Sequence, residues 1–257
     1  MITRFVALGD SFTEGVGDDD PGSPNSVRGW ADRTAGALAR HTPELRYANL
    51  AVRGKLMREI LGTQLDRALN LSPDLVSVYA GGNDLMRPRV DIDALAEEYD
   101  HAVGTLAATG ATVVLFTGVD GVEDPVFRRM RGRTAIYNEH VRLIAGRHGA
   151  TLVDMWAMRA LRDRRMWSAD RIHLNAHGHT LVAAAVLDAL SVDHEVTAAD
   201  LGPAKILEPA RRRAENLAWV REHATPWLLR RLRGESSGDA VAAKRPELAP
   251  VDQPGHR

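Results

Sequence analysis

Short apolar segments without polar alternation recur along the chain up to Leu190, and helical patterns separate them. Continuous apolar runs such as Val-Val-Leu-Phe-Thr at 113–117 indicate strands buried on both faces, as in a parallel sheet. Parallel neighbours need a crossover, usually a right-handed one through a helix. The pattern therefore predicts an α/β protein, a three-layer α/β/α sandwich. The expected strands are 5–8, 47–50, 75–80, 113–117 and 151–153, and the expected helices are 30–39, 56–69, 92–108, 133–148 and 176–190.

The chain length suits one such domain followed by a shorter extension. With 257 residues, 44% of them hydrophobic, the chain can bury a complete sheet. We expect the α/β domain to span 1–192. Residues 193–233 carry further helical patterns, at 208–223 and 227–233, and we expect this extension to pack on the core. Residues 234–257 are polar and rich in proline, which predicts a disordered tail.

Charge and cysteine content exclude several classes of function. The formal net charge is -1, so no overall field attracts nucleic acid, and we expect no nucleic-acid partner. The absence of cysteine excludes disulfides, thiolate catalysis and Cys-ligated zinc. No apolar run approaches the roughly 18 residues of a membrane span, and the first residues lack a signal-peptide core. We therefore expect a cytoplasmic protein without a transmembrane segment.

Small and polar residues follow the first three expected strands. Gly9-Asp10-Ser11 comes after the first, Gly54 after the second, and Gly81-Gly82-Asn83-Asp84 after the third. The carboxyl ends of parallel strands share one edge of the sheet, where ligands bind. A serine hydroxyl can act as a nucleophile, and a glycine N–H and an asparagine amide can stabilise an oxyanion. Each of these segments by itself also suits a turn or a helix cap.

An acid–base pair precedes the last expected helix of the domain. Asp170 and His173 lie three residues apart, close enough for the carboxylate to hold imidazole Nδ1. That contact fixes the tautomer and leaves Nε2 free to accept a proton from a serine. A surface Asp–His pair without catalytic function is the alternative.

Taken together and in this order, the segments resemble the SGNH hydrolase family, also called GDSL esterases and lipases. The resemblance covers roughly residues 3–190, and its motifs are Gly9–Gly15, Gly54, Gly81–Asp84 and Asp170–His179. It implies a flavodoxin-like, five-stranded parallel sheet between helices. This agrees with the strand and helix pattern.

The resemblance also implies a role for each motif residue. Ser11 attacks the ester carbonyl, His173 takes its proton, and Asp170 orients His173. The N–H groups of Ser11 and Gly54 and the side chain of Asn83 hold the oxyanion. An acyl-enzyme forms and water hydrolyses it, without a metal or cofactor.

Other residues are candidates for the substrate pocket or for a metal. His173, His177 and His179 form a cluster, but no HExxH pattern accompanies it. The family shows a similar His-rich run without metal, so we expect none. The candidate pocket residues lie beside the motifs or in the loops of the active face: Asp10, Phe12, Asp84, Phe127 and Trp167.

The sequence thus predicts a carboxylic ester hydrolase for small or medium acyl esters. An O-acetylated sugar or metabolite, a lysophospholipid or a thioester would each fit, that is, a small-molecule or lipid-like ester. An acyltransferase with the same triad and a catalytically silent binding module are the alternatives. The substrate, the oligomeric state and the role of the basic C-terminal helices stay open.

Overall fold

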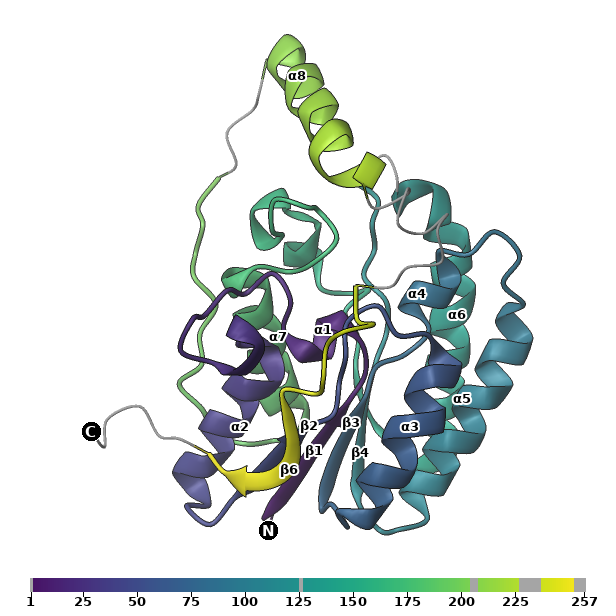
Figure 1. Ribbon diagram of the computed structural model, residues 1–257, viewed down its shortest axis with the longest axis vertical. Coiled ribbons are helices and arrows are strands. Elements are labelled where there is room, and N and C mark those ends of the chain that lie inside the picture. Colours follow the sequence, from purple (N-terminus) through teal and green to yellow (C-terminus); the bar gives the residue numbers. More distant parts are fainter. Residues whose placement is uncertain (1, 125–126, 204–207, 227–236, 252–257) are drawn as a thin grey trace.

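The computed structural model describes residues 2–124, 127–203, 208–226 and 237–251 (Figure 1). A six-stranded sheet with the order β5-β4-β3-β1-β2-β6 runs through the middle of the molecule. Five strands are parallel, and β6 pairs antiparallel to β2. The predicted α/β fold is confirmed, with one strand more than expected. The strands are β1 (Arg4–Leu8), β2 (Arg46–Asn49), β3 (Leu75–Val78), β4 (Thr112–Phe116), β5 (Thr151–Val153) and β6 (Arg245–Pro250).

Helices cover both faces of this sheet (Figure 1). Helices α2 and α7 pack together on one face, and α3, α5 and α6 lie on the other. Two short helices, α1 and α4, follow β1 and β3 directly. The longer helices are α2 (Gly29–His41), α3 (Met57–Asn70), α5 (Ile92–Ala107), α6 (Phe127–His148) and α7 (Ala176–Ala189), and the shorter ones are α1 (Ser11–Glu14), α4 (Gly82–Leu85) and the 3-10 turns η1 (Pro24–Ser26), η2 (Arg159–Arg162) and η3 (Arg164–Met166).

The central strand β1 shows why the sequence folds into three layers. Its side chains alternate, so that Phe5 and Ala7 join the core beneath α2 and α7. Val6 and Leu8 join the core beneath α3, α5 and α6. All four are buried, and burying a side chain as large as those of Phe5, Val6 and Leu8 stabilises the fold by about 1.5–3 kcal/mol. A strand that is apolar at four consecutive positions, Phe5 to Leu8, therefore requires a helical layer on each face.

Helix α6 begins six residues earlier than the sequence predicts. Residues 127–132 are basic and form no apolar stripe, so the expected helix began at Arg133. In the structure Asp124 accepts hydrogen bonds from the backbone N–H groups of Phe127 and Arg128, which supports the first turn. Arg131 then reaches the buried carboxylate of Asp120, at 2.6 Å. Capping and this ion pair stabilise the additional turns, together with Met130, which packs against the core.

The predicted disordered tail is wrong for residues 237–251. Residues 245–250 form β6, which extends the sheet beside β2 (Figure 1). Pro246 and Pro250 suggested disorder, because proline cannot take part in a central strand. An edge strand leaves one row of N–H groups unpaired and tolerates proline there. Residues 252–257 lie outside the described residues.

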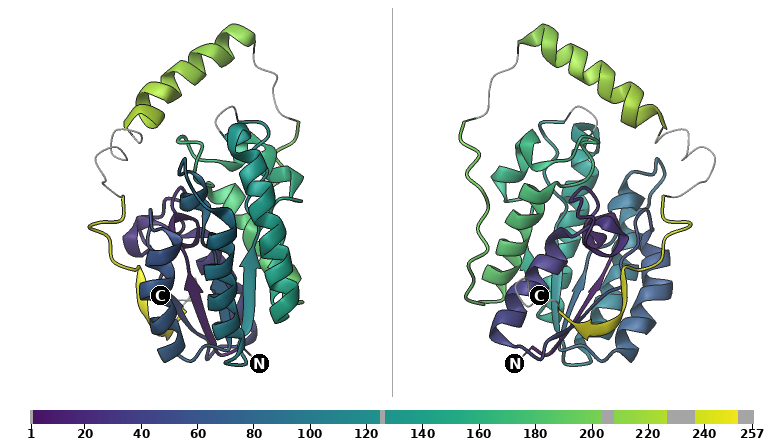
Figure 2. Two further views of the ribbon diagram at one scale, coloured as in Figure 1. Left: turned by 90° about the vertical axis from the view of Figure 1, so that its right-hand side faces the viewer. Right: turned by 60° about the vertical axis from the view of Figure 1, so that its left-hand side comes forward.

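The extension before this tail also differs from the prediction. Residues 192–203 form no helix, and helix α8 (Pro209–Trp219) continues into a π-helical turn, η4 (Val220–Ala224). Helix α8 stands beyond the carboxyl ends of the parallel strands, apart from the helical layers (Figure 2). It does not pack along the core as expected. The second predicted helix of the extension, 227–233, lies outside the described residues.

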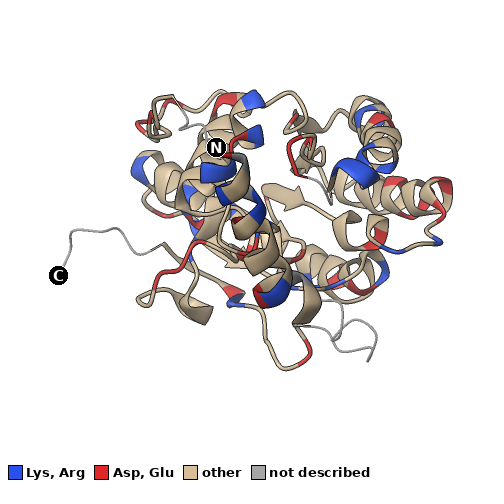
Figure 3. Cartoon of the chain, turned by 90° about the horizontal axis from the view of Figure 1, so that it is seen from above, with Lys and Arg blue, Asp and Glu red and all other residues tan. Residues whose placement is uncertain are grey.

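Charge and hydropathy show no dominant feature in the described part of the chain. Seen from the end where α8 stands, basic and acidic residues are interspersed (Figure 3). Within the described ranges, no helix is both long enough and apolar enough to cross a bilayer.

Candidate active site

Ser11 lies at the carboxyl end of the central strand. β1 ends at Leu8, and Ser11 is the first residue of α1, which Asp10 caps through the Phe12 N–H. Gly9 between them has a φ of +153°. A Cβ at this position would lie 2.5 Å from Thr13 Oγ1, so the turn requires glycine. The strand and the turn together place Ser11 at the predicted edge of the sheet.

The structure brings the three predicted triad residues together. His173 Nε2 lies 3.0 Å from Ser11 Oγ. His173 Nδ1 lies 2.6 Å from Asp170 Oδ2. All three side chains are half-buried, so the serine is accessible. This is the arrangement in which an imidazole can take a proton from a serine hydroxyl while a carboxylate fixes its tautomer.

Asp170 is held in its charged form. Burial raises the pKa of its carboxyl, but the hydrogen bond to His173 and the imidazole charge lower it more, and the Ser168 hydroxyl adds to this. The net result is a pKa well below the usual range of an aspartate. Asp170 therefore stays ionised and can stabilise a positively charged His173.

The two other predicted oxyanion residues, Gly54 and Asn83, follow the strands on either side of β1. Gly54 lies in the turn after β2, with a φ of +77°. Asn83 lies in α4, after β3, and its amide nitrogen contacts Asp10 Oδ2 at 3.2 Å and the Lys55 carbonyl at 3.0 Å. Asn83 is thereby fixed beside Asp10, the residue that precedes the serine. In this state both of its N–H groups already have acceptors.

Burial raises the pKa of Asp10 to about 7, and nearby Asp84 adds to the rise, whereas the Phe12 N–H and His173 lower it. A neutral Asp10 places no negative charge against an oxyanion. Asp84, another predicted pocket residue, is half-buried and accepts a hydrogen bond from Met57 N–H at 2.9 Å. It therefore joins the first turn of α3 to α4.

The three aromatic candidates for the pocket are placed mainly by packing. Phe12 stacks against Trp30, with ring centroids 5.6 Å apart, and packs against the tilted ring of Tyr79 at 4.7 Å, and so anchors α1 in the core. Trp167 donates its indole N–H to the Leu161 carbonyl and packs against the core. Phe127 is half-buried in the first turn of α6. No described contact assigns any of these three to a substrate.

The three histidines of the expected cluster have separate surroundings. His173 belongs to the triad, and His177 is exposed at the start of α7. His179 is buried, accepts a hydrogen bond from the Trp30 N–H at 3.2 Å and lies 3.4 Å from the Val16 carbonyl. His179 thus joins the loop that follows the helix of Ser11 to α2.

The buried His179 makes the stability depend on pH. Burial lowers its pKa from 6.5 to about 4, although Asp18 opposes this. As the pH is lowered, the unfolded chain begins to bind this proton near pH 6.5, whereas the native chain binds it only near pH 4. The free energy of unfolding therefore decreases as the pH falls from about 6.5 to about 4. The loss attributable to His179 is at most about 3 kcal/mol.

Urea titrations of wild type and His179→Gln from pH 7.5 to 4.5 test this expectation. Asp10 titrates in the same range with the opposite sign, because its raised pKa lets the native state bind a proton first. The relevant quantity is therefore the difference in the free energy of unfolding between wild type and His179→Gln. It should shrink as the pH falls, and a difference that is constant with pH would contradict the expected titration.

Two buried polar residues near Ser11 were missed in the sequence. Gln64 on α3 clamps Gly9, accepting from its N–H at 2.8 Å and donating to its carbonyl at 2.9 Å. Glu14, at the end of α1, accepts from Arg53 N–H at 2.7 Å and pairs with the Arg53 guanidinium at 2.6 Å. A polar residue at a core position of α3, and a glutamate inside the nucleophile motif, were the available signals.

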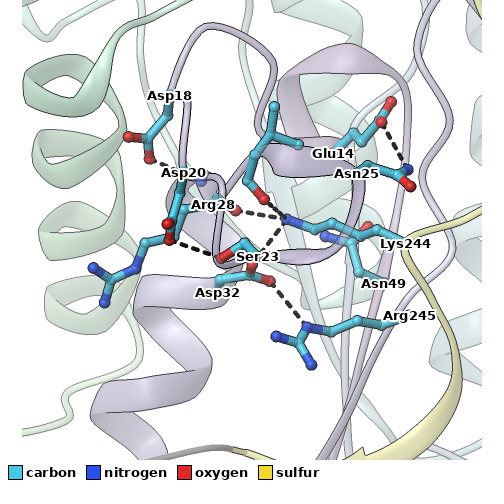
Figure 4. Close-up of polar contacts among 12 residues, drawn as sticks. Glu14, Asp18, Asp20, Ser23, Asn25, Arg28, Asp32, Asn49, Lys244 and Arg245 are labelled. Carbon is cyan, nitrogen blue, oxygen red and sulfur yellow. Dashed lines mark hydrogen bonds and ion pairs between the residues drawn. The ribbon is translucent and has the colours of Figure 1, made fainter. Parts of the chain in front are cut away.

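The C-terminal segment, residues 237–251, also contacts residues that follow Ser11 in the chain (Figure 4). Lys244 Nζ, fully buried, lies 2.9 Å from Asp32 Oδ2 and 2.6 Å from the Arg28 carbonyl at the start of α2. Gly238 lies so close to the Arg53 carbonyl that a Cβ would approach it to 2.0 Å. The C-terminal segment thus contacts the loop that contains Gly54 and the start of α2.

Comparison with known proteins shows the family of this chain. The sequence profile of the GDSL-like lipase/acylhydrolase family matches residues 7–181, which include all five predicted catalytic and oxyanion residues. The chain belongs to this family. It is an SGNH ester hydrolase, and its six-stranded, mostly parallel sheet is the fold of its structural relatives.

Several solved structures resemble this GDSL hydrolase. LAE5, an α/β hydrolase from the metagenome of Lake Arreo, is 26% identical, with a TM-score of 0.61 over 74% of this chain and 95% of its own. A catalytic mutant of Axe2, an acetylxylan esterase from Geobacillus stearothermophilus, is 19% identical, with a TM-score of 0.63 over 74% and 95%. The psychrotrophic esterase EstA from Pseudoalteromonas sp. is 17% identical, with a TM-score of 0.57 over 74% and 97%. No curated protein sequence matches.

Proposed function

We propose that this GDSL hydrolase cleaves carboxylic esters through an acyl-enzyme on Ser11. The distance of 3.0 Å between His173 Nε2 and Ser11 Oγ carries the proposal. Ser11 Oγ bonds to the ester carbonyl carbon while His173 takes the hydroxyl proton. The tetrahedral intermediate then expels the alkoxide, which leaves with that proton. Water repeats the sequence on the acyl-enzyme, releasing the acid and free Ser11.

The oxyanion of each intermediate would be held by the N–H groups of Ser11 and Gly54 and by the Asn83 side chain. For this, Asn83 has to redirect one N–H from its present acceptors, Asp10 or Lys55. A protonated Asp10 is the weaker acceptor of the two, because it carries no charge. Its raised pKa therefore supports the release of an Asn83 N–H to the oxyanion near neutral pH.

Small and medium acyl groups are the proposed substrates. Two carboxyls adjoin Ser11 and Asn83: that of Asp10, which contacts Asn83, and that of Asp84, which is half-buried. A long acyl chain packed against Asp84 would desolvate its carboxyl further, at a cost that a short acyl chain avoids. This supports O-acetyl or other short esters, including those of sugars and metabolites, and thioesters of similar size.

A p-nitrophenyl ester series from acetate to palmitate tests both points. We expect kcat/KM to be highest for the short and medium esters. A fluorophosphonate should label Ser11, read as a mass shift on the peptide that contains it. Highest turnover of palmitate would overturn the size preference, and labelling at another residue would overturn the nucleophile. An added acceptor alcohol would reveal acyl transfer as a new ester product.

A further inference from the structure

The turn that carries the acid–base pair has a strained backbone. Residues 168–173, here called the acid–base turn, contain Arg171 at a φ of +61°. This left-handed conformation is unfavourable for a non-glycine residue, because it brings Cβ too close to the following carbonyl oxygen. The turn also brings the backbone N–H groups of Ile172 and His173 to the Asp170 carboxylate, at 2.9 and 3.0 Å. The geometry of the acid–base pair therefore depends on a conformation that Arg171 does not favour by itself.

Helix α8 contacts this turn directly. The indole Nε1 of Trp219 donates a hydrogen bond to the Asp170 carbonyl at 2.8 Å. The Arg171 guanidinium lies over the Trp219 ring, 5.1 Å from its centroid, and donates to Asn216 Oδ1 at 2.6 Å. Helix α8 thus contacts the backbone just before Arg171 and also the Arg171 side chain.

The rest of α8 has little other packing. Trp219 is 8% exposed, whereas Leu217, two residues earlier, is 68% exposed. Figure 2 shows that α8 stands away from both helical layers. It also lies beyond residue 181, where the match to the family profile ends. Among the side chains of α8 that the structure describes, the one that is buried is the one on the acid–base turn.

We infer that α8 is a positioning element for catalysis, and that Trp219 and Arg171 are positioning residues that keep Asp170 and His173 in line with Ser11. The inference rests on the proposed function, in which these three form the triad. Without the Trp219 contacts, Arg171 would leave the left-handed region for part of the time. His173 Nε2 would then spend less time at hydrogen-bond distance from Ser11 Oγ.

Kinetics of the full-length Trp219→Ala variant test this inference. A misplacement of catalytic groups by about 1 Å can cost up to 100-fold in rate, so we expect kcat to fall by about 10- to 100-fold. KM should stay within a factor of about two, because the contacts with the bound ester do not change. Leu217→Ala, on the exposed side of the same helix, is the matched control and should leave kcat and KM unchanged.

A second substitution separates positioning from a general loss of structure. Asparagine adopts the left-handed conformation more readily than most residues. Arg171→Asn in the Trp219→Ala background should therefore restore most of the lost kcat, although it restores no contact with α8. Trp219→Phe, which keeps a ring beneath the guanidinium but loses the N–H donor, should lie between wild type and Trp219→Ala.

The rate of fluorophosphonate labelling measures the reactivity of Ser11 independently of the choice of ester substrate. It should fall in Trp219→Ala to the same extent as kcat. Equal labelling rates in wild type and Trp219→Ala would overturn the role of α8 while leaving the triad intact. A similar loss in Leu217→Ala, or no recovery with Arg171→Asn, would also overturn it. Absence of labelling at Ser11 in wild type would overturn the proposed function, and this inference with it.

Discussion

Replacing Ser11 by alanine should reduce kcat for ester hydrolysis by about 10⁴- to 10⁶-fold, which is the range of losses when a triad nucleophile is removed. The reason is geometric. The Ser11 hydroxyl lies 3.0 Å from the imidazole that would accept its proton, at the carboxyl end of the central strand. Alanine leaves the donors of the oxyanion site in place but provides no atom to carry the acyl group. Steady-state turnover of the best p-nitrophenyl ester measures the effect.

The fold should survive this substitution, because Ser11 contributes one half-buried hydroxyl and no core packing. The melting temperature of Ser11→Ala should therefore stay close to that of wild type. Ser168→Ala is a useful comparison, since Ser168 donates to Asp170 at 2.6 Å but is not placed to attack the ester. It should retain most of the activity. Turnover of Ser11→Ala at wild-type rates would remove Ser11 from the mechanism.

Ending the chain after residue 236 should lower the free energy of unfolding by about 3–5 kcal/mol, the usual cost of leaving one partner of a buried ion pair alone. The deletion removes the fully buried Lys244 and leaves Asp32, which is 8% exposed, without that ammonium group. It also uncovers the edge of β2, which pairs with β6. For a chain of this size the melting temperature should fall by roughly 6–20 °C.

Two point variants show whether the ion pair carries the effect. Lys244→Met should lower stability by less than the deletion, because Arg245 Nε remains 3.7 Å from Asp32 Oδ1. Asp32→Asn added to Lys244→Met should recover part of the loss, since the buried carboxylate charge is then removed. Glu247→Gln is the matched control on β6. Its contact with Arg67 is largely exposed and contributes less than about 1 kcal/mol. An unchanged melting temperature after the deletion would contradict packing of this segment.

Residues of the C-terminal segment show where reasoning from the sequence fails. Lys244 lies in a polar, proline-rich stretch, and composition alone favours disorder there. Its partners lie more than 200 residues earlier: Asp32 and the carbonyls of Val27 and Arg28. No local pattern encodes a contact between segments so far apart. Gln64 is a similar case, since its role depends on the position of Gly9 above α3.

The sequence by itself determined the alternation of strands and helices, the parallel sheet and the motif residues at the strand ends. These follow from local periodicity, and from the rule that parallel strands bring their carboxyl ends to one edge. Only the tertiary structure decided that Phe12 anchors the helix of Ser11 by packing against the core, that β6 forms one edge of the sheet, and that Trp219 contacts the turn of Asp170. Each of these depends on which distant segments meet in space, and a one-dimensional pattern of hydrophobicity and turn residues does not contain that information.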